Sequence, residues 1–468
     1  MVKFDGKIVQ FGFGAVGKSF FELVGKEIKF DKNNYFVITK YDSEFEPFIQ
    51  LGGKADNFVA VNVTKEIFGD LFSKYLQKGD LLVDFSEGTG TKELCLWCAN
   101  NNIMYLNTGE SEWPGDWVDF YERNKSLRQM ILEISENKDI NKHPIVLQHG
   151  NNPGLVSHFV KVAIEKIAYI KKNKIAKKAI KEYKFNEAAR LLKIKTIHIN
   201  DIDNQIIDEV YSDEKMYTTW CAENFFYEML TPAAYNLGTH KRIEEKTNGE
   251  FGHVELDKLA VETRLYTYYP GGCFEGFIVP HEETISIARH LEVSIEEKVI
   301  YRPTVIFVYK PPALAEEYLF RSKVNSYPNP DKDKPQDGVD CEGTVIMRGH
   351  KFPYDWEIVY DQISSGAEYV GILVMGENFE PIWVGNCLEI NNLRKMTNKK
   401  GLFWQTPTIT PVAASALAAV CFMINNKTKG GIYFPDDIKD YKKIIKIAEK
   451  YTSKTISKKL KNIIVKTL

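Results

Sequence analysis

The chain has 468 residues, of which 44% are hydrophobic and 26% are charged, so it can form two or three compact domains and is neither collagenous nor wholly disordered. Its 61 basic and 63 acidic residues give a net charge of -2, which predicts no general attraction to nucleic acid or to an anionic membrane. The sequence opens without a secretion-signal pattern, and its seven scattered cysteines fit a reducing compartment. We therefore expect a cytoplasmic protein.

The first 150 residues alternate short apolar runs with amphipathic helical windows, which is the pattern of parallel βαβ units. Six strands are expected, at 8–11, 35–39, 58–63, 81–85, 103–106 and 145–147. The window from 120 to 136 is expected to be one of the helices. This alternation predicts an α/β fold of Rossmann type, with a doubly wound parallel sheet.

Cys95 and Cys98 form an isolated CxxC pair inside an apolar helical window. No second pair lies at zinc spacing, so packing in the core is favoured over metal binding or redox chemistry. No metal site is predicted.

The pattern changes after the turn at Asn152, Pro153 and Gly154. A helix is expected from 155 to 170, and the lysine-rich stretch after it is interpreted as a solvated helix face. Strand-like runs with few helices between them predict a second, α+β domain on a mainly antiparallel sheet. These runs lie at 195–199, 299–309, 344–347, 369–375 and 382–390, with an exposed loop expected at 326–336.

The longest nearly apolar stretch, Pro411 to Ile424, is rich in alanine and too short to span a bilayer. It predicts a buried helix, which we expect to return to the first domain. The predicted domains are therefore 1–153 together with 406–468, and 154–405.

A GxGxxG motif directly follows the first predicted strand and opens a helical window. It comprises Gly12, Phe13, Gly14, Ala15, Val16 and Gly17. The first glycine permits the tight turn, the second lets the backbone approach a pyrophosphate, and the third allows close helix packing. The helix N-terminus adds free N–H groups and a positive dipole. This context predicts a dinucleotide site, and a glycine turn without ligand is the alternative.

Asp42, shortly after the second strand, can accept a hydrogen bond from a ribose 2′-hydroxyl and favours NAD, whereas Lys40 could instead meet the 2′-phosphate of NADP. Polar residues at later strand ends are further candidates for cofactor contacts, although each can alternatively cap a helix. These candidates are Thr64, Ser86, Thr89, Thr108, Asn152 and Pro153.

Acidic and aromatic residues gather in later loops, where binding sites are commonly built. The loop at 108–117 contains Glu110, Glu112, Trp113, Asp116 and Trp117. Later come Asp201 and Asp203 after a strand, Trp220, Glu223 and Glu228 on an expected short helix, and His281, Glu282 and Glu283 between apolar runs. Each residue alone is more often surface or core, but together they favour a cationic ligand, because no arginine cluster accompanies them to clamp a carboxylate.

Several stretches, in their sequence and in their order along the chain, resemble those of the bacterial homospermidine synthases, which are NAD-dependent members of the saccharopine dehydrogenase-like group. The matching stretches are GFGAVG at 12–17, HGNNPGLVSHF at 149–159, IHINDIDNQ at 197–205, TW at 219–220, GFIVPHEETISIA at 276–288, YRPT at 301–304 and the helix after Pro411.

The resemblance implies a homodimeric enzyme that makes homospermidine from two putrescines and releases ammonia, with NAD reduced and reoxidised inside one cycle and with spermidine as a further aminobutyl donor. The second domain would then bind the substrate and form the dimer. The resemblance places substrate-site residues at Asn152, Asp201, Trp220, Glu223, Glu228, His281, Glu283 and Glu368, with either Glu110 or Glu112 beside them. At Gly88 the family carries an acid that this chain lacks.

These residue types suit the chemistry of a diamine, because carboxylates and a tryptophan face can compensate the lost hydration of a dication. Hydride can leave only from a carbon that bears a neutral amine, so a carboxylate or His281 has to take a proton. The alternatives are a reductive amine dehydrogenase, such as saccharopine or carboxynorspermidine dehydrogenase, and a non-catalytic NAD-binding protein.

Overall fold

The computed structural model describes residues 1–116, 118–137, 140–208, 215–240, 250–321, 338–339, 345–347, 350–352 and 356–461. The chain divides into two compact units. Unit 1 comprises Met1–Gly154 and Arg394–Tyr451, and unit 2 comprises Leu155–Leu393 and Thr452–Leu468. In the described ranges, no helix has both the length and the apolar character needed to cross a membrane.

The C-terminal segment differs from the predicted domain division. The sequence boundaries placed all of 406–468 in the first domain, but β27 (Ile456–Lys459) pairs with β25 (Ile382–Glu389) in unit 2. This strand has the sequence Ile-Ser-Lys-Lys, which is too polar and too short to stand out as a strand.

Unit 1 is built on a seven-stranded sheet in which all the strand pairs are parallel. From one edge to the other it contains β26 (Gly431–Tyr433), β8 (Pro144–Val146), β7 (Met104–Asn107), β6 (Leu81–Asp84), β2 (Ile8–Phe11), β4 (Tyr35–Thr39) and β5 (Phe58–Ala60). The order reverses direction at β2, as in a doubly wound sheet, so the predicted Rossmann-type fold is confirmed. The sequence did not reveal β26, a short edge strand far from the other six.

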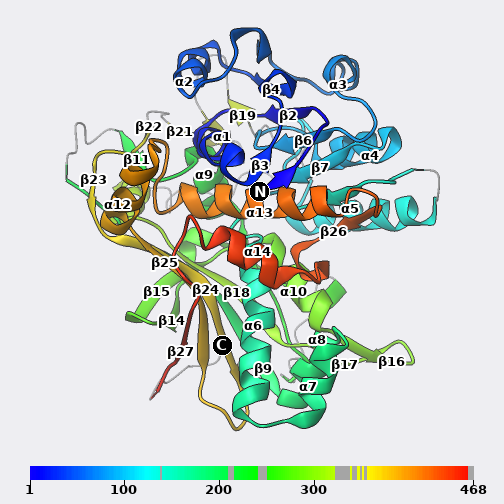
Figure 1. The fold of residues 1–468 in the computed structure, drawn as a ribbon. Helices are drawn as coiled ribbons and strands as arrows, with labels where there is room; N and C mark the ends of the chain where they lie inside the picture. The colour runs from blue at the N-terminus through cyan, green and yellow to red at the C-terminus, as the bar shows by residue number, and fades with distance from the viewer. Residues whose placement is uncertain are drawn as a thin grey trace. The chain divides into compact units, whose positions relative to one another are not determined.

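Helices connect and flank these strands (Figure 1). They are α1 (Ala15–Glu27), α2 (Phe45–Gln50), α3 (Phe68–Tyr75), α4 (Thr91–Asn101), α5 (Phe120–Glu136), α13 (Ile409–Asn425) and α14 (Tyr441–Ala448). The small side chains of α13, such as Ala413 and Ala416, are fully buried, and α13 packs against α1. The alanine-rich pattern therefore serves close packing between helices.

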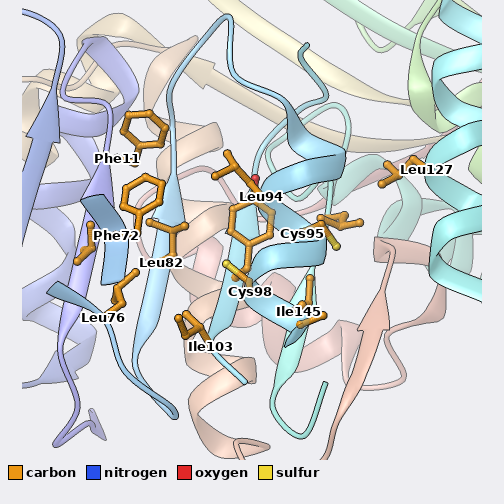
Figure 2. Close-up of a cluster of buried hydrophobic side chains, with 14 of the residues drawn as sticks. Phe11, Phe72, Leu76, Leu82, Leu94, Cys95, Cys98, Ile103, Leu127 and Ile145 are labelled. Carbon is orange, nitrogen blue, oxygen red and sulfur yellow. The ribbon is translucent and has the colours of Figure 1, made fainter. Parts of the chain in front are cut away.

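Cys95 and Cys98 lie in the hydrophobic core of unit 1, among side chains such as Leu82 and Ile103 (Figure 2). Both are free thiols without exposed surface. Burial raises the pKa of the Cys95 thiol to about 12 and that of Cys98 well above its usual value, so neither forms a thiolate readily. The structure supports the packing interpretation of this CxxC pair.

Unit 2 contains a nine-stranded mixed sheet. Its main path is β13 (His253–Leu259), β12 (Pro232–Asn236), β18 (Thr304–Lys310), β9 (Ile194–Asp203), β24 (Ala367–Gly376), β25 and β27, and the hairpin β14 (Leu265–Tyr269) and β15 (Gly272–Ile278) joins it at β18. The central pair, β9 and β18, is parallel, and the other pairs are antiparallel. The predicted mainly antiparallel sheet is confirmed.

Two predicted strands have different bounds in the structure. The run 299–309 is interrupted at Arg302 and Pro303, and it forms β17 (Lys298–Tyr301) and β18. A proline lacks the N–H that a central strand must donate, which explains the break. Strand β9 continues past residue 199 to Asp203, so Asp201 and Asp203 lie inside a strand and not in the loop after it. The predicted exposed loop at 326–336 lies outside the described residues.

Helices α6 (Leu155–Ile170), α8 (Phe185–Leu192) and α10 (Glu282–Leu291) pack on the sheet of unit 2 and on one another. The lysine-rich stretch forms α7 (Lys174–Lys181), whose lysines are largely exposed, as expected for a solvated face. Two further helices of unit 2, α9 (Ala222–Leu230) and α11 (Ala313–Arg321), have nine residues each.

Candidate active site

The glycine motif forms the turn between β2 and α1. Gly12 has φ +89°, and a Cβ there would lie 2.7 Å from the carbonyl of Phe85. A Cβ on Gly17 would lie 2.6 Å from the carbonyl oxygen of Gly12, whereas a Cβ on Gly14 would meet nothing within 4 Å. The first and third glycines are thus required by packing, and the second leaves open space at a helix N-terminus, which fits a bound pyrophosphate.

Gln10 braces this turn from within β2. Its Nε2 donates to the carbonyl oxygens of Gly12 and Gly17, each at 3.0 Å, and its Oε1 accepts from the Tyr35 hydroxyl at 2.6 Å. The side chain is fully buried. Sequence reasoning missed this residue, although a glutamine in the middle of an apolar strand was a signal that could have revealed it.

The residues predicted for the ribose lie after β4. Asp42 is exposed at the start of the short 3₁₀ helix Asp42–Glu44. Lys18 of α1 pairs with Glu44 at 2.6 Å and lies 4.5 Å from the ring centroid of Trp404. The acid that this lysine neutralises is therefore Glu44, whereas Asp42 is exposed. Asp42 lies three residues after Thr39, the last residue of β4, and its role at a ribose stays a prediction.

Polar groups after β6 form one hydrogen-bonded network. Asp84 accepts from the main chain and hydroxyl of Ser86 at 2.9 and 2.5 Å and from Tyr105 at 2.8 Å. Ser86 also lies 2.7 Å from Thr89 Oγ1. Burial raises the pKa of Asp84 to about 6, and these hydrogen bonds limit the rise. The hydroxyls of Ser86 and Thr89 thus order the loop after β6. In the loop after β5, the Thr64 hydroxyl donates to Glu66 at 2.6 Å.

The acids of the loop at 108–117 are engaged within unit 1. The buried Glu110 lies 3.4 Å from Arg123 and hydrogen-bonds Gln148, while Glu112 accepts from the main chain of Val118 at 2.8 Å. The other members divide between core and surface. Trp113 is buried against Phe68, Asp116 pairs with Lys65, Thr108 is half-buried, and Trp117 lies outside the described residues.

Asn152 and Pro153 follow β8 in the last loop of the first chain segment of unit 1. Their peptide bond is cis, and the carbonyl of Pro153 accepts from Gly150 N at 2.7 Å. Asn152 is half-buried and Pro153 is buried. Sequence analysis predicted both as cofactor contacts, and their place after a strand end of the parallel sheet is compatible with that role.

The register of the sheet in unit 2 brings several predicted residues together. Asp203 lies opposite Glu368 of β24, and Asp201 lies opposite Tyr309 of β18. Residues that face each other across neighbouring strands, and residues two apart on one strand, share a face. Asp201, Asp203, Tyr309 and Glu368 therefore project from the same side of the sheet, and all four are buried.

His281 sits among carboxylates at the N-terminus of α10. Its Nδ1 contacts Glu283 closely and lies 3.6 Å from Glu282, while its Nε2 lies 3.6 Å from Glu228 of α9. The ring stacks on Phe307, with centroids 4.2 Å apart. Burial opposes charge on His281, but the surrounding carboxylates prevail and hold its pKa well above the usual value. Burial also raises the pKa of Glu228 and Glu283.

Trp220 precedes α9 by two residues, so the expected position on that helix is wrong. Thr219 is hydrogen-bonded to Asp203 on β9, and this bond holds the segment outside the helix. The indole Nε1 donates to the hydroxyl of Tyr309 at 2.9 Å. Glu223 lies on α9, but its side chain is outside the described part of the structure.

Comparisons with known proteins match a family model to the first part of the chain and homospermidine synthases to nearly all of it. The family model described as "Saccharopine dehydrogenase NADP binding domain" matches residues 8–143. A homospermidine synthase of Mesorhizobium japonicum is 26% identical over 95% of this chain and 88% of its own length. A homospermidine synthase of Blastochloris viridis is 25% identical over 96% of this chain and 90% of its own length.

Solved structures agree in fold. A homospermidine synthase of Legionella pneumophila, solved in complex with NAD, has a TM-score of 0.83 and 24% identity, covering 100% of this chain and 95% of that chain. Saccharopine dehydrogenase of Saccharomyces cerevisiae has a TM-score of 0.51 and 12% identity, covering 97% of this chain and 99% of that chain. The resemblance inferred from the sequence is confirmed: along nearly its entire length, the chain is similar to the homospermidine synthases.

Proposed function

We propose that the chain is a homospermidine synthase that joins two putrescines into homospermidine and releases ammonia. The observation that carries this proposal is the buried group of carboxylates in unit 2, on a chain similar to homospermidine synthases over 95% of its length. A substrate that carries carboxylates would need basic partners instead. Two arginines of unit 2, Arg264 and Arg302, pair with Glu316 and Glu292, and the negative charge of the buried carboxylates suits an ammonium ligand.

Unit 1 supplies the cofactor site. The open position at Gly14, the positive end of α1 and the exposed Asp42 support NAD as the bound dinucleotide. Although the matching family model is named for NADP, a carboxylate at Asp42 would repel a 2′-phosphate. When bound, NAD supplies a hydride acceptor that later returns the hydride within the same cycle.

Unit 2 binds and orients the diamine. Asp201 and Glu368 on the sheet, with Glu228 and Glu283 beside His281, offer negative charge to two ammonium groups. Burial strengthens these charge interactions because little water screens them. Trp220 contributes an aromatic face, and a desolvated cation–π contact is worth about 2 kcal/mol.

The reacting amine has to lose its proton before hydride can leave its carbon. The carboxylates around His281 raise its pKa well above the usual value, which favours the protonated imidazolium and points to a carboxylate as the proton acceptor. Glu228 lies 3.6 Å from His281 Nε2, and its pKa is raised by burial. We assign the proton acceptor to Glu228, with the imidazolium of His281 able to return a proton to the departing ammonia.

The finer parts of the proposal rest on the resemblance. They are a homodimeric enzyme, spermidine as a second aminobutyl donor and a cytoplasmic location. The six cysteines described, all free thiols, support a reducing compartment. Light scattering of the purified protein tests the dimer, and turnover of labelled spermidine tests the donor.

The decisive test incubates the protein with putrescine and a catalytic amount of NAD, while homospermidine and ammonia are measured by chromatography. Product should exceed the NAD supplied many times over, and absorbance of NADH should not grow in proportion to it. Stoichiometric accumulation of NADH, or no homospermidine at all, would contradict the proposal.

A further inference from the structure

The indole ring of Trp220 is held by Tyr309. The indole Nε1 donates to the Tyr309 hydroxyl at 2.9 Å, and the two rings meet edge to face, with centroids 6.3 Å apart and planes at 80°. Tyr309 also meets Phe225 edge to face, with ring centroids 6.4 Å apart. The edge of the indole that carries the N–H is therefore tied, while Trp220 remains only partly buried.

The main chain beneath Trp220 is anchored separately. Thr219 Oγ1 donates to Asp203 at 2.6 Å, and Asp203 also accepts from the side chain and main chain of Gln205 at 2.9 to 3.0 Å. The preceding Thr218 belongs to the short strand β11 (Met216–Thr218). Because the backbone is held from β9, the remaining freedom of Trp220 is the rotation of its side chain, and Tyr309 restrains that rotation.

Tyr309 is well suited to this task because it stays neutral. It is buried beside Asp201, Asp203 and Glu228, and burial together with these three carboxylates raises the pKa of its phenol well above 10. A neutral hydroxyl accepts the indole N–H at every pH at which the protein would work. Its position on β18, opposite Asp201, also places the restraint next to the group of carboxylates.

We propose that Tyr309 is a positioning residue that orients the indole of Trp220 so that its face meets the ammonium end of the diamine. The inference rests on the proposed function, since it names how one group of that site is aimed. A cation gains from an aromatic ring only when it lies over the face, so a freely rotating indole would lose part of this interaction.

The test is a double-mutant cycle with Tyr309→Phe and Trp220→Phe. Tyr309→Phe removes the hydroxyl and keeps the ring, and loss of one hydrogen bond predicts that kcat/KM for putrescine falls about threefold to tenfold, mainly through KM. In a Trp220→Phe background the same change should cost less than about twofold, because its effect passes through Trp220. Additive losses in the cycle would overturn the proposal.

Fluorescence of the free protein provides a readout that does not depend on turnover. Tyr309→Phe should change the emission of Trp220, and this difference should disappear when both proteins also carry Trp220→Phe. The matched control is Tyr301→Phe, since Tyr301 is also a buried tyrosine of unit 2, whose hydroxyl donates to Ile194 O at 2.9 Å at the opposite end of β9. The control should lower the melting temperature and leave KM unchanged.

The outcomes separate the two proposals. If the wild type makes no homospermidine, the proposed function fails, but the emission cycle still decides whether Tyr309 positions Trp220. If the wild type is active and Tyr309→Phe changes neither KM nor emission, the positioning role is wrong while the proposed function stands.

Discussion

In unit 1 the candidate cofactor site depends on the main chain of a glycine turn, whereas in unit 2 the candidate substrate site depends on charged side chains. Around Gly12, Gly14 and Gly17, what matters is the absence of a Cβ, and Gln10 holds the turn by bonding to its carbonyl oxygens. Around His281, what matters is the number of carboxylates and their burial. Shape governs the first site and charge governs the second. We therefore expect added side-chain volume to impair the site of unit 1, and loss of charge at constant shape to impair the site of unit 2.

The largest effect is expected from Glu283→Gln, which keeps shape and removes charge. Glu283 is fully buried and contacts His281 directly, so its loss lowers the pKa of His281 and removes a charge that compensates the substrate cation. We expect kcat/KM for putrescine to fall about 10²- to 10⁴-fold, the range typical of acid–base groups. Affinity for NAD, measured by calorimetry, should stay within about twofold.

Glu316→Gln is the matched control for Glu283→Gln. Glu316 is a partly buried acid of unit 2 on α11, and it pairs with Arg264 at 3.7 Å. Its replacement should change kcat/KM less than about twofold, as for a partly exposed pair. Equal losses in the two variants would show that general destabilisation, and not the charge at His281, explains the effect.

Unit 1 is tested by placing the same methyl group at two glycines. Gly14→Ala should fold normally, because its Cβ meets nothing within 4 Å, but should weaken NAD binding about 10- to 100-fold by occupying the space of the pyrophosphate. Gly17→Ala should instead destabilise the fold by about 1–3 kcal/mol, since its Cβ would lie 2.6 Å from the Gly12 carbonyl oxygen. Thermal unfolding and calorimetry separate the two outcomes, and equal melting temperatures would contradict the packing argument.

The contrast between the units also explains what the sequence could predict. The turn at Gly12 is local, since its strand, glycines and helix lie within about twenty consecutive residues, and the strand order follows from the βαβ pattern. The pairing of Asp201 with Tyr309 joins residues about a hundred positions apart, and no periodicity encodes that register. The resemblance named Asp201 as a candidate substrate residue, but it did not name Tyr309.

Single side chains show the same limit. Asp201 was expected just after a strand, where the apolar run ends, yet the sheet buries it inside β9 next to other acids. Trp113 was grouped with the acids near it, but it packs into the core against Phe68. The spacing of residues in the sequence predicts the helix or strand on which a side chain lies, whereas tertiary packing decides which way that side chain faces.

Unit 1 also contains a buried carboxylate, Asp84, whose charged form destabilises the fold because it is removed from water. Burial raises the pKa of Asp84 from 3.8 to about 6, so in this window the folded chain holds a proton that the unfolded chain has released. Stability from this group is therefore lost as the pH rises from about 4 to 6. Asp84→Asn can still accept from Ser86, and its amide can donate to the Tyr105 oxygen.

We expect Asp84→Asn to gain stability relative to the wild type as the pH rises from about 4 to 7, by about 2 kcal/mol in all. Denaturant unfolding at several pH values measures this difference, and NAD affinity reports whether the loop after β6 is preserved. Parallel stability curves for the two proteins would contradict the raised pKa, and the sign is opposite to that expected for an acid with a basic partner.

The smallest effect is expected at Asp201, where charge and length can be varied separately. Asp201→Asn keeps the shape and loses the charge, so KM for putrescine should rise about tenfold, which corresponds to about 1.4 kcal/mol, while NAD affinity is unchanged. Asp201→Glu keeps the charge and lengthens the side chain by one methylene, so it should change KM less than about threefold if charge decides binding here.

The control for this pair is Asp257→Asn, since Asp257 is an exposed acid on β13 of the same unit. Its replacement changes the net charge of the protein equally but should leave KM unchanged, because exposed charges are screened by water and salt. If Asp201→Asn behaves like Asp257→Asn, then the carboxylate of Asp201 is structural. If Asp201→Glu loses as much as Asp201→Asn, then shape governs this position as it governs the glycines of unit 1, and the contrast between the two units does not extend to β9.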